Sequence, residues 1–190
     1  MTLSFRVLAV ALSIAVLCVS APVRAERLSA PLEAAIHLRA LSYDRALKKR
    51  VGDSVVIAIL YDPASESSVQ SSDEMRDALI SLSKKVKVQD LPLVVKSVAY
   101  KDAWPTNELA AASVVYVTRG LEGRLNEIRT QTVRHGIRTL CGDRDLARQG
   151  LAVAVYVNGT SPGLTINLAA ARSAGMDLDS RLLAIAEVLK

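Results

Sequence analysis

The chain has 190 residues, 51% of them hydrophobic and 23% charged, which predicts one domain with a sizeable core and excludes a disordered chain. Aromatic residues make up only 4%, too few for a surface that stacks the bases of single-stranded nucleic acid. Two cysteines and two histidines exclude a disulfide scaffold and a zinc module.

The first 25 residues are predicted to form an export signal. Arg6 precedes an uncharged apolar run over residues 7–19. This run has the length of a signal-peptide core and is shorter than the roughly 20 residues that span a bilayer. Small residues at Val23 and Ala25 suit a signal peptidase, so we expect cleavage after residue 25 and a periplasmic protein. The alternatives are an uncleaved anchor and a lipid-anchored Cys18, which the large preceding residue disfavours.

The predicted mature domain, residues 26–190, retains 22 basic and 19 acidic residues and a net charge of +3. The basic residues are spread along the chain, whereas a nucleic-acid reader carries a basic stripe, so no nucleic-acid partner is expected. Cys141 is its only cysteine, which leaves no intramolecular disulfide. No second apolar run has membrane-spanning length, so no membrane insertion is expected after signal cleavage.

Apolar periodicity and turn residues predict the elements of this domain. In chain order they are a helix over 31–50, a strand over 55–61, a serine-rich loop over 65–72, a helix over 75–85, a strand over 94–98, a short helix over 108–112, a strand over 113–118, a helix over 121–132, a strand over 136–141, a polar bend, a hairpin of 151–157 and 164–168, and a closing helix over 180–189. Alternating strands and helices predict a single-domain α/β fold, a mostly parallel sheet with helices on both faces and a C-terminal antiparallel hairpin.

The sequence indicates no enzyme, cofactor or metal site. It contains no glycine-rich dinucleotide or P-loop fingerprint and no nucleophile elbow. His135 and Cys141 stand six residues apart, about 20 Å along an extended strand, so a surface histidine and a buried thiol are expected rather than a catalytic pair. His37 lies beside apolar helix positions and is expected to be packed or solvent-facing.

Two aspartates mark a possible ligand cleft. Asp62 follows the first predicted strand and Asp102 the second, and the carboxyl ends of parallel strands are where open α/β sheets bind ligands. An ordinary Asp-Pro turn is the alternative at Asp62. The sequon at 158–160 is expected to be a hairpin turn, and the basic run at 84–87 a solvated helix end.

The C-terminal third carries a more specific pattern. Ile137-Arg138-Thr139-Leu140 leads into a hairpin, then Thr165-Ile166-Asn167-Leu168, Ala170-Ala171-Arg172, Gly175-Met176-Asp177-Leu178 and a Leu182-Leu183 helix. This succession resembles the YfiR-type family of small periplasmic proteins. Ser113–Val117 fits the middle strand of that family, and Leu41–Arg45 resembles one branch of it.

The resemblance implies a non-enzymatic, often dimeric regulator that binds the periplasmic part of a membrane diguanylate cyclase and represses cyclic-di-GMP output and biofilm formation. Two departures place this chain in a divergent branch. Cys141 has no cysteine partner for redox control, and Tyr43-Asp44-Arg45 stands where many members carry an aromatic-Trp-Pro turn. The membrane partner could therefore be a cyclase or a sensor kinase.

We expect Tyr43 and Arg45 to contact that partner, as exposed residues of the first helix. The residues of the family motif are expected to have structural roles, and Asn167 is expected to satisfy backbone groups near a strand end. The other motif residues are Arg172, Gly175, Leu182 and Leu183. The rival hypothesis is a periplasmic small-ligand binding protein that uses the cleft near Asp62 and Asp102.

Overall fold

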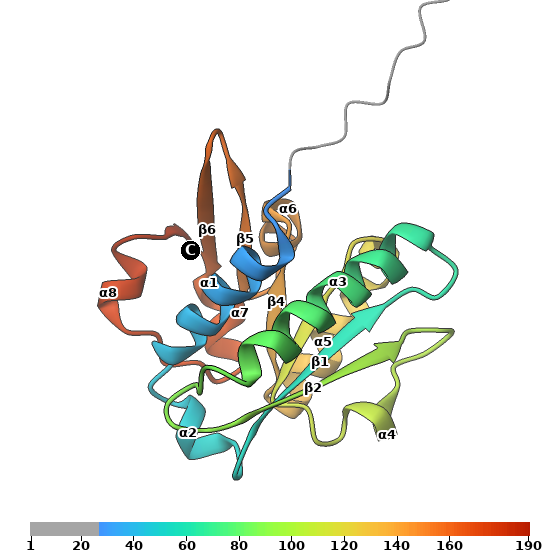
Figure 1. The fold of residues 1–190 in the computed structure, drawn as a ribbon, viewed down its shortest axis with the longest axis horizontal. Helices are drawn as coiled ribbons and strands as arrows, with labels where there is room; N and C mark the ends of the chain where they lie inside the picture. The colour runs from blue at the N-terminus through green and yellow to red at the C-terminus, as the bar shows by residue number, and fades with distance from the viewer. Residues whose placement is uncertain (1–26) are drawn as a thin grey trace, which may run out of the picture.

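The computed structural model describes residues 27–190, so the predicted signal segment lies outside the described residues. One seven-stranded sheet, in the order β2-β1-β3-β4-β5-β6-β7, runs through this part of the chain (Figure 1). The strands are β1 (Val55–Tyr61), β2 (Leu93–Ala99), β3 (Val114–Val117), β4 (Arg138–Cys141), β5 (Val153–Asn158), β6 (Ser161–Asn167) and β7 (Glu187–Leu189). Neighbouring strands are parallel except in the β5–β6 hairpin, which confirms the predicted fold class.

The helices form a layer on each face of the sheet. They are α1 (Ala30–Ser42), α2 (Leu47–Arg50), α3 (Glu66–Ser83), α4 (Thr106–Leu109), α5 (Leu125–His135), α6 (Arg144–Arg148), α7 (Leu168–Ser173) and α8 (Ser180–Leu183), with a short 3-10 turn, η1 (Glu122–Arg124), before α5. In Figure 1, α1 and α3 lie in front of the sheet and α5 lies behind it.

Helices cover both faces of strand β1, which explains why its sequence is apolar throughout. Ile57 and Ile59 pack with α1 and α3 in one core, while Ala58 and Leu60 pack with α4 and α5 in the other. Because side chains alternate between faces, a strand covered by helices on both sides needs apolar residues at successive positions. The two cores therefore meet only through the sheet.

The serine-rich segment over 65–72 is not the predicted loop. Helix α3 begins at Glu66, and the Ser65 side chain caps it by accepting a hydrogen bond from a backbone N–H of its first turn. Ser68 and Ser72 are buried; their hydroxyls bond Thr118 Oγ1 at 2.6 Å and Ser97 Oγ at 3.1 Å. Small hydroxyl side chains thus replace apolar ones on the buried face of this helix, which hides the helical periodicity.

Two further elements differ from prediction near the C-terminus. The predicted polar bend contains α6, capped by the carboxylate of Asp143. The predicted closing helix ends at Leu183, and Glu187–Leu189 forms β7, a parallel edge strand on β6. The hairpin is confirmed; its two strands run to Asn158 and Ser161, and Gly159 adopts φ +62° in the tight turn between them.

The predicted continuous first helix is instead broken between α1 and α2 by a buried charge. Asp44 is fully buried, and its Oδ2 accepts a hydrogen bond from Nε of Arg138 at 2.6 Å. Its Oδ1 accepts the backbone N–H of Ala46 at 3.0 Å and that of Asp177 at 2.8 Å. One carboxylate therefore holds together the α1–α2 turn, the first residue of β4 and the segment before α8.

We predict that Asp44→Ala lowers the free energy of unfolding by about 3–5 kcal/mol, because it leaves the buried Arg138 guanidinium without a counter-charge. Urea denaturation of the full chain, followed by circular dichroism, measures this loss. Replacing both residues, Asp44→Leu with Arg138→Leu, should lower the free energy of unfolding less than Asp44→Ala alone. The control is Arg45→Ala, which breaks an exposed ion pair and should change stability little. Equal stability of Asp44→Ala and Arg45→Ala would contradict the anchoring role.

Candidate functional site

Tyr43 lies directly after α1, half-buried, with two guanidinium groups close to its ring. The Cζ of Arg39 lies 5.0 Å from the ring centroid and that of Arg181 lies 5.6 Å from it. Arg39 also donates a hydrogen bond from Nη2 to the Tyr43 hydroxyl at 3.1 Å. Cations over an aromatic face are attracted by its quadrupole, so both contacts favour this orientation of the ring.

Arg45 is exposed and fixed to the segment that precedes α8. Its Nη2 donates to Oδ1 of Asp177 at 2.8 Å, and its backbone N–H donates to the Asp177 carbonyl at 2.8 Å. Asp179 in turn donates its backbone N–H to the Tyr43 carbonyl at 3.0 Å. Hydrogen bonds from the side chain and backbone of Arg181 lower the pKa of Asp179 to about 2. These residues are called the Tyr43 surface below: Arg39, Tyr43, Arg45, Asp177, Asp179 and Arg181.

The remaining motif residues have different local environments. Asn167 ends β6; its Oδ1 accepts the N–H of Ala170 at 3.0 Å and its Nδ2 donates to the Ala147 carbonyl at 2.9 Å. Gly175 has φ +74°, and an added Cβ would meet the Arg50 guanidinium. The other motif positions differ in exposure: Leu182 is buried, Leu183 packs partly against the core and Arg172 is exposed.

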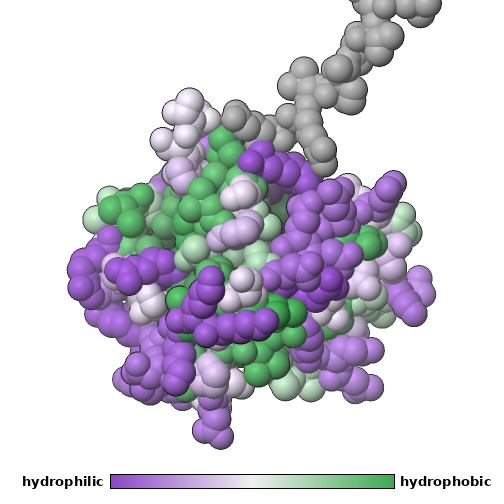
Figure 2. All heavy atoms as spheres, in the orientation of Figure 1, coloured by the Kyte–Doolittle hydropathy of each residue, from purple (hydrophilic) through white to green (hydrophobic). Residues whose placement is uncertain are grey.

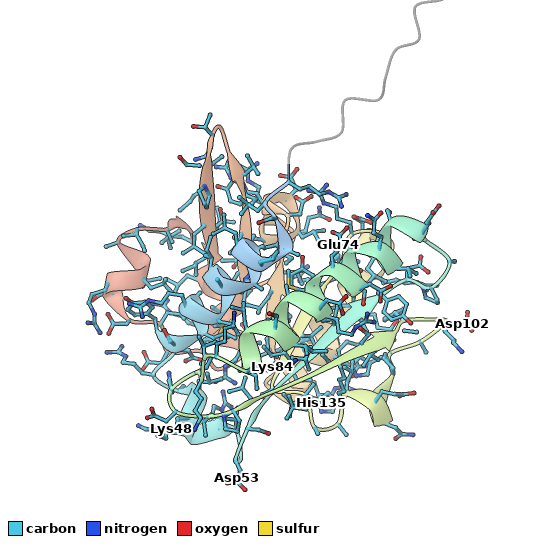
Figure 3. The ribbon with its side chains drawn as sticks, viewed as in Figure 1. Lys48, Asp53, Glu74, Lys84, Asp102 and His135 are labelled. Carbon is cyan, nitrogen blue, oxygen red and sulfur yellow. The ribbon has the colours of Figure 1, made fainter. Side chains whose placement is uncertain are left out.

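Asp62 and Asp102 do not form the expected cleft. The carboxylate of Asp62 accepts the backbone N–H of Ala64 at 2.8 Å, as in a local Asp-Pro turn. Asp102 is exposed in the loop between β2 and α4 and points away from the molecule (Figure 3). Neither residue lines the cavity that the structure has at the carboxyl edge of the sheet.

That cavity, the carboxyl-edge cavity, lies at the ends of β3, β4 and β5 and has a volume of about 180 Å³. Its polar lining comes from the segment before α1, from α1, α3, β3, β5 and the start of α6, and from the loops after β3 and β4: Arg27, Glu33, Ser71, Tyr116, Arg119, Asp143, Arg144 and Tyr156. Sequence reasoning placed a cleft at this edge but considered only the first two strands. The charged residues directly after the third and fourth strands were the available signal.

Buried polar groups surround the inner wall of the carboxyl-edge cavity. The Tyr116 hydroxyl donates to Oε1 of Glu33 at 2.7 Å, and burial raises the pKa of this phenol well above its ordinary value. His37 is buried, with its ring edge-to-face on Tyr116 at 5.7 Å and its Nε2 3.5 Å from Glu33 Oε1. At the rim, Arg119 Nη2 lies 3.2 Å from Oδ2 of Asp143. The cavity thus presents a carboxylate and guanidinium groups together.

A wider groove of about 940 Å³ runs between α5 and α7 on the other side of the molecule. Its walls include exposed α5 side chains and small α7 residues, among them Arg129, Thr130, Val133, Ala170 and Ser173. Ligands of open α/β sheets bind outside the carboxyl ends of the strands. The carboxyl-edge cavity is therefore the stronger small-ligand candidate of the two.

His135 and Cys141 do not come together as a catalytic pair. His135 is exposed at the end of α5 (Figure 3), whereas Cys141 is fully buried at the end of β4. Burial raises the pKa of the Cys141 thiol to about 12, so the nucleophilic thiolate is scarce at neutral pH.

Within residues 27–190 no group of three or more acidic, histidine or cysteine side chains is placed to hold a metal ion. The same residues include no helix with the length and apolarity needed to cross a membrane.

We predict that Cys141 in the folded chain resists alkylation by iodoacetamide at pH 8 and reacts readily in denaturant, because burial keeps the thiol protonated and inaccessible. Mass spectrometry of the peptide that contains Cys141 measures the labelling, and it separates this thiol from Cys18 in any uncleaved chain. Rapid labelling of the native protein would show that β4 opens more easily than its burial indicates.

The chain was compared with protein-family models, with curated proteins and with solved structures. Residues 32–187 match the model of the YfiR/HmsC-like family. A search of curated proteins gave no match.

Solved structures with a similar fold include a conserved domain protein from Vibrio cholerae, with a TM-score of 0.60 and 11% identity, covering 83% of this chain and 60% of that one. The ABC domain from Streptococcus pneumonia in complex with L-Trp gives a TM-score of 0.57 at 14% identity, covering 83% and 62%. A ligand-free, open substrate binding protein with adhesive properties from Clostridium difficile gives 0.52 at 14% identity, covering 76% and 57%. The chain therefore spans about three fifths of the length of these proteins, and at such identities the likeness shows the fold alone.

Proposed function

The chain belongs to the YfiR/HmsC-like family of non-catalytic periplasmic regulators, and we propose that it docks on the periplasmic part of a membrane signalling protein and represses that protein's output. The family resemblance favours a diguanylate cyclase as the partner, so that docking lowers cyclic-di-GMP and biofilm formation; a sensor kinase is the other partner class. The homodimer that the resemblance implies stays a prediction.

The observation that carries this proposal is the Tyr43 surface. Tyrosine and arginine are over-represented in the centres of protein interfaces, because each offers a large contact area together with hydrogen-bonding groups. Tyr43 has two arginines within cation–π distance of its ring, and the turn that bears it is tied to the core through the buried Asp44. A surface held in one conformation loses little entropy on binding, which favours docking.

We predict that the tagged full chain, purified from the periplasm, captures one membrane signalling protein from detergent-solubilised membranes of its own cells. Tyr43→Ala and Arg45→Ala should each reduce the captured amount about tenfold, as expected for interface anchors. Mass spectrometry identifies the captured protein, and quantitative immunoblotting measures its amount.

The control variant is Arg134→Ala, which removes an exposed arginine from α5 on the opposite side of the sheet. Thermal unfolding of each variant checks that the fold is retained. Capture of no membrane protein, or undiminished capture by both Tyr43→Ala and Arg45→Ala, would refute docking through this surface.

A second candidate function is small-ligand binding in the carboxyl-edge cavity. Its support is the location beyond the ends of parallel strands, together with a lining that contains carboxylate and guanidinium groups. Glu33 accepts a hydrogen bond from Tyr116, while Arg119 pairs with Asp143 and Arg144 with Glu187, so a ligand would share these groups with their present partners. This pattern fits a small zwitterion such as an amino acid. The similar Streptococcus structure was solved with L-Trp, which makes that amino acid a reasonable member of a test panel.

We predict that an amino acid bound in this cavity raises the unfolding temperature of the full chain. At a ligand concentration a hundredfold above Kd the stabilisation would be about 2.7 kcal/mol. The panel comprises the common amino acids, including L-tryptophan, and differential scanning fluorimetry records the shift. Arg119→Ala should abolish the shift, whereas Arg45→Ala should leave it unchanged. No shift with any panel member would remove amino acids as ligands of the cavity.

A further inference from the structure

A groove between α1 and α3 lies beside the Tyr43 surface. It has a volume of about 220 Å³, and its walls are formed by Ala35 and Leu38 from α1 and by Leu82, Val86 and Val88 from the end of α3 and the segment after it. Two polar residues of α1, Arg39 and Ser42, line its end next to Tyr43. We call this hollow the α1–α3 groove.

The local course of the chain after α3 explains the groove. Helix α3 ends at Ser83, and Val86 donates its backbone N–H to the Leu82 carbonyl at 2.9 Å. Val88 is buried and forms a short antiparallel bridge with Leu91, and it lines the groove together with residues of both helices. Val86 is left 40% exposed, and Ile80 on the last turns of α3 is 38% exposed. Figure 2 shows apolar surface on this side of the molecule between strongly hydrophilic side chains.

The rim of the groove is positively charged. Arg39 and Lys87 line it, and the exposed Lys84 (Figure 3) and Lys85 follow the end of α3. Within residues 27–190 none of these four cations forms a salt bridge with a carboxylate. No acidic residue lines the groove. An apolar floor is thus bordered by cations that lack a counter-charge.

From this pattern we infer that the α1–α3 groove binds an acidic amphipathic segment of the membrane partner, with apolar side chains in the groove and carboxylates on its basic rim. The inference rests on the proposed docking function and specifies the chemistry of the partner. Charge complementarity steers encounter and selects among partners, while apolar contacts in the groove slow dissociation. The occupant is a protein segment rather than a bilayer, because a hollow between two helices accepts inserted side chains that a flat lipid surface does not supply.

The test uses a synthetic helical peptide with leucines along one face and glutamates along the other. Fluorescence anisotropy of the labelled peptide measures its binding to the full chain. We expect binding that weakens as salt is added, that falls about tenfold in Lys87→Glu and that falls similarly in Val86→Ser. Arg134→Glu, an equal charge reversal on α5, should bind the peptide like the wild type, and a peptide with serines in place of leucines should not bind.

The capture experiment from membranes distinguishes failure of the groove as a binding site from failure of the docking function. Peptide binding that depends on Lys87 and Val86 supports the groove. Membrane capture that Tyr43→Ala reduces but Lys87→Glu and Val86→Ser leave intact would overturn the groove and leave the docking function standing. Absence of peptide binding would overturn it as well. Lys87-dependent binding to phosphatidylglycerol vesicles, with no binding of the peptide, would assign the surface to lipid instead and overturn the inference.

Discussion

The buried ion pair between Asp44 and Arg138 is the interaction on which the other features depend. Burying two charges costs several kcal/mol per ion. The Asp44 carboxylate accepts three hydrogen bonds, whereas Nη2 of Arg138 is buried and has no hydrogen-bond partner within residues 27–190. Two of the three groups that bond the carboxylate, the Arg138 side chain and the Asp177 N–H, come from positions 94 and 133 residues further along the chain. The pair therefore joins the first helix to the C-terminal third, and it holds the turn that carries Tyr43 and Arg45 against the segment from Asp177 to Asp179.

The sequence predicts the sheet well because its parallel strands are covered on both faces and appear as continuous apolar runs. It fails where tertiary partners replace the usual pattern. Ser68 and Ser72 stand on the buried face of α3 ahead of Met75, Ala78 and Leu79, and Thr118 and Ser97 satisfy their hydroxyls across the interface. Similarly, Glu187–Leu189 is a strand because β6 offers a free edge and Arg144 pairs with the Glu187 carboxylate. The local pattern of apolar residues predicts neither the hydrogen-bond partners of the two serines nor the pairing of Glu187–Leu189 with β6.

The candidate sites were predictable to different degrees. Tyr43 and Arg45 could be named from their motif, and Arg39 stands at the helical i,i+4 spacing from Tyr43. Their contacts with Asp177 and Arg181 bridge more than 130 residues, and no local pattern links these residues to them. The cleft was expected near Asp62 and Asp102, whereas the cavity at the carboxyl edge lies further along the sheet, at the ends of β3, β4 and β5. Its lining could not be derived, because Glu33 arrives from a helix that precedes the first strand and packs on Tyr116 of the third. Asp62 lies at the expected edge, but its carboxylate accepts a hydrogen bond from Ala64 within its own turn.

Helix α1 carries parts of all three candidate surfaces, and its geometry keeps the two functional hypotheses separable. Glu33 belongs to the first turn of α1 and lines the carboxyl-edge cavity, whereas Arg39 and Ser42 line the groove near the other end. At 1.5 Å per residue, Glu33 and Tyr43 lie about 15 Å apart along the axis. Substitutions more than about 7–10 Å apart with no shared partner usually act additively. A regulator in which ligand binding altered partner capture would therefore have to move α1 as a body. The packing of Ala34, Leu38 and Leu41 in the core it shares with α3 opposes such a movement.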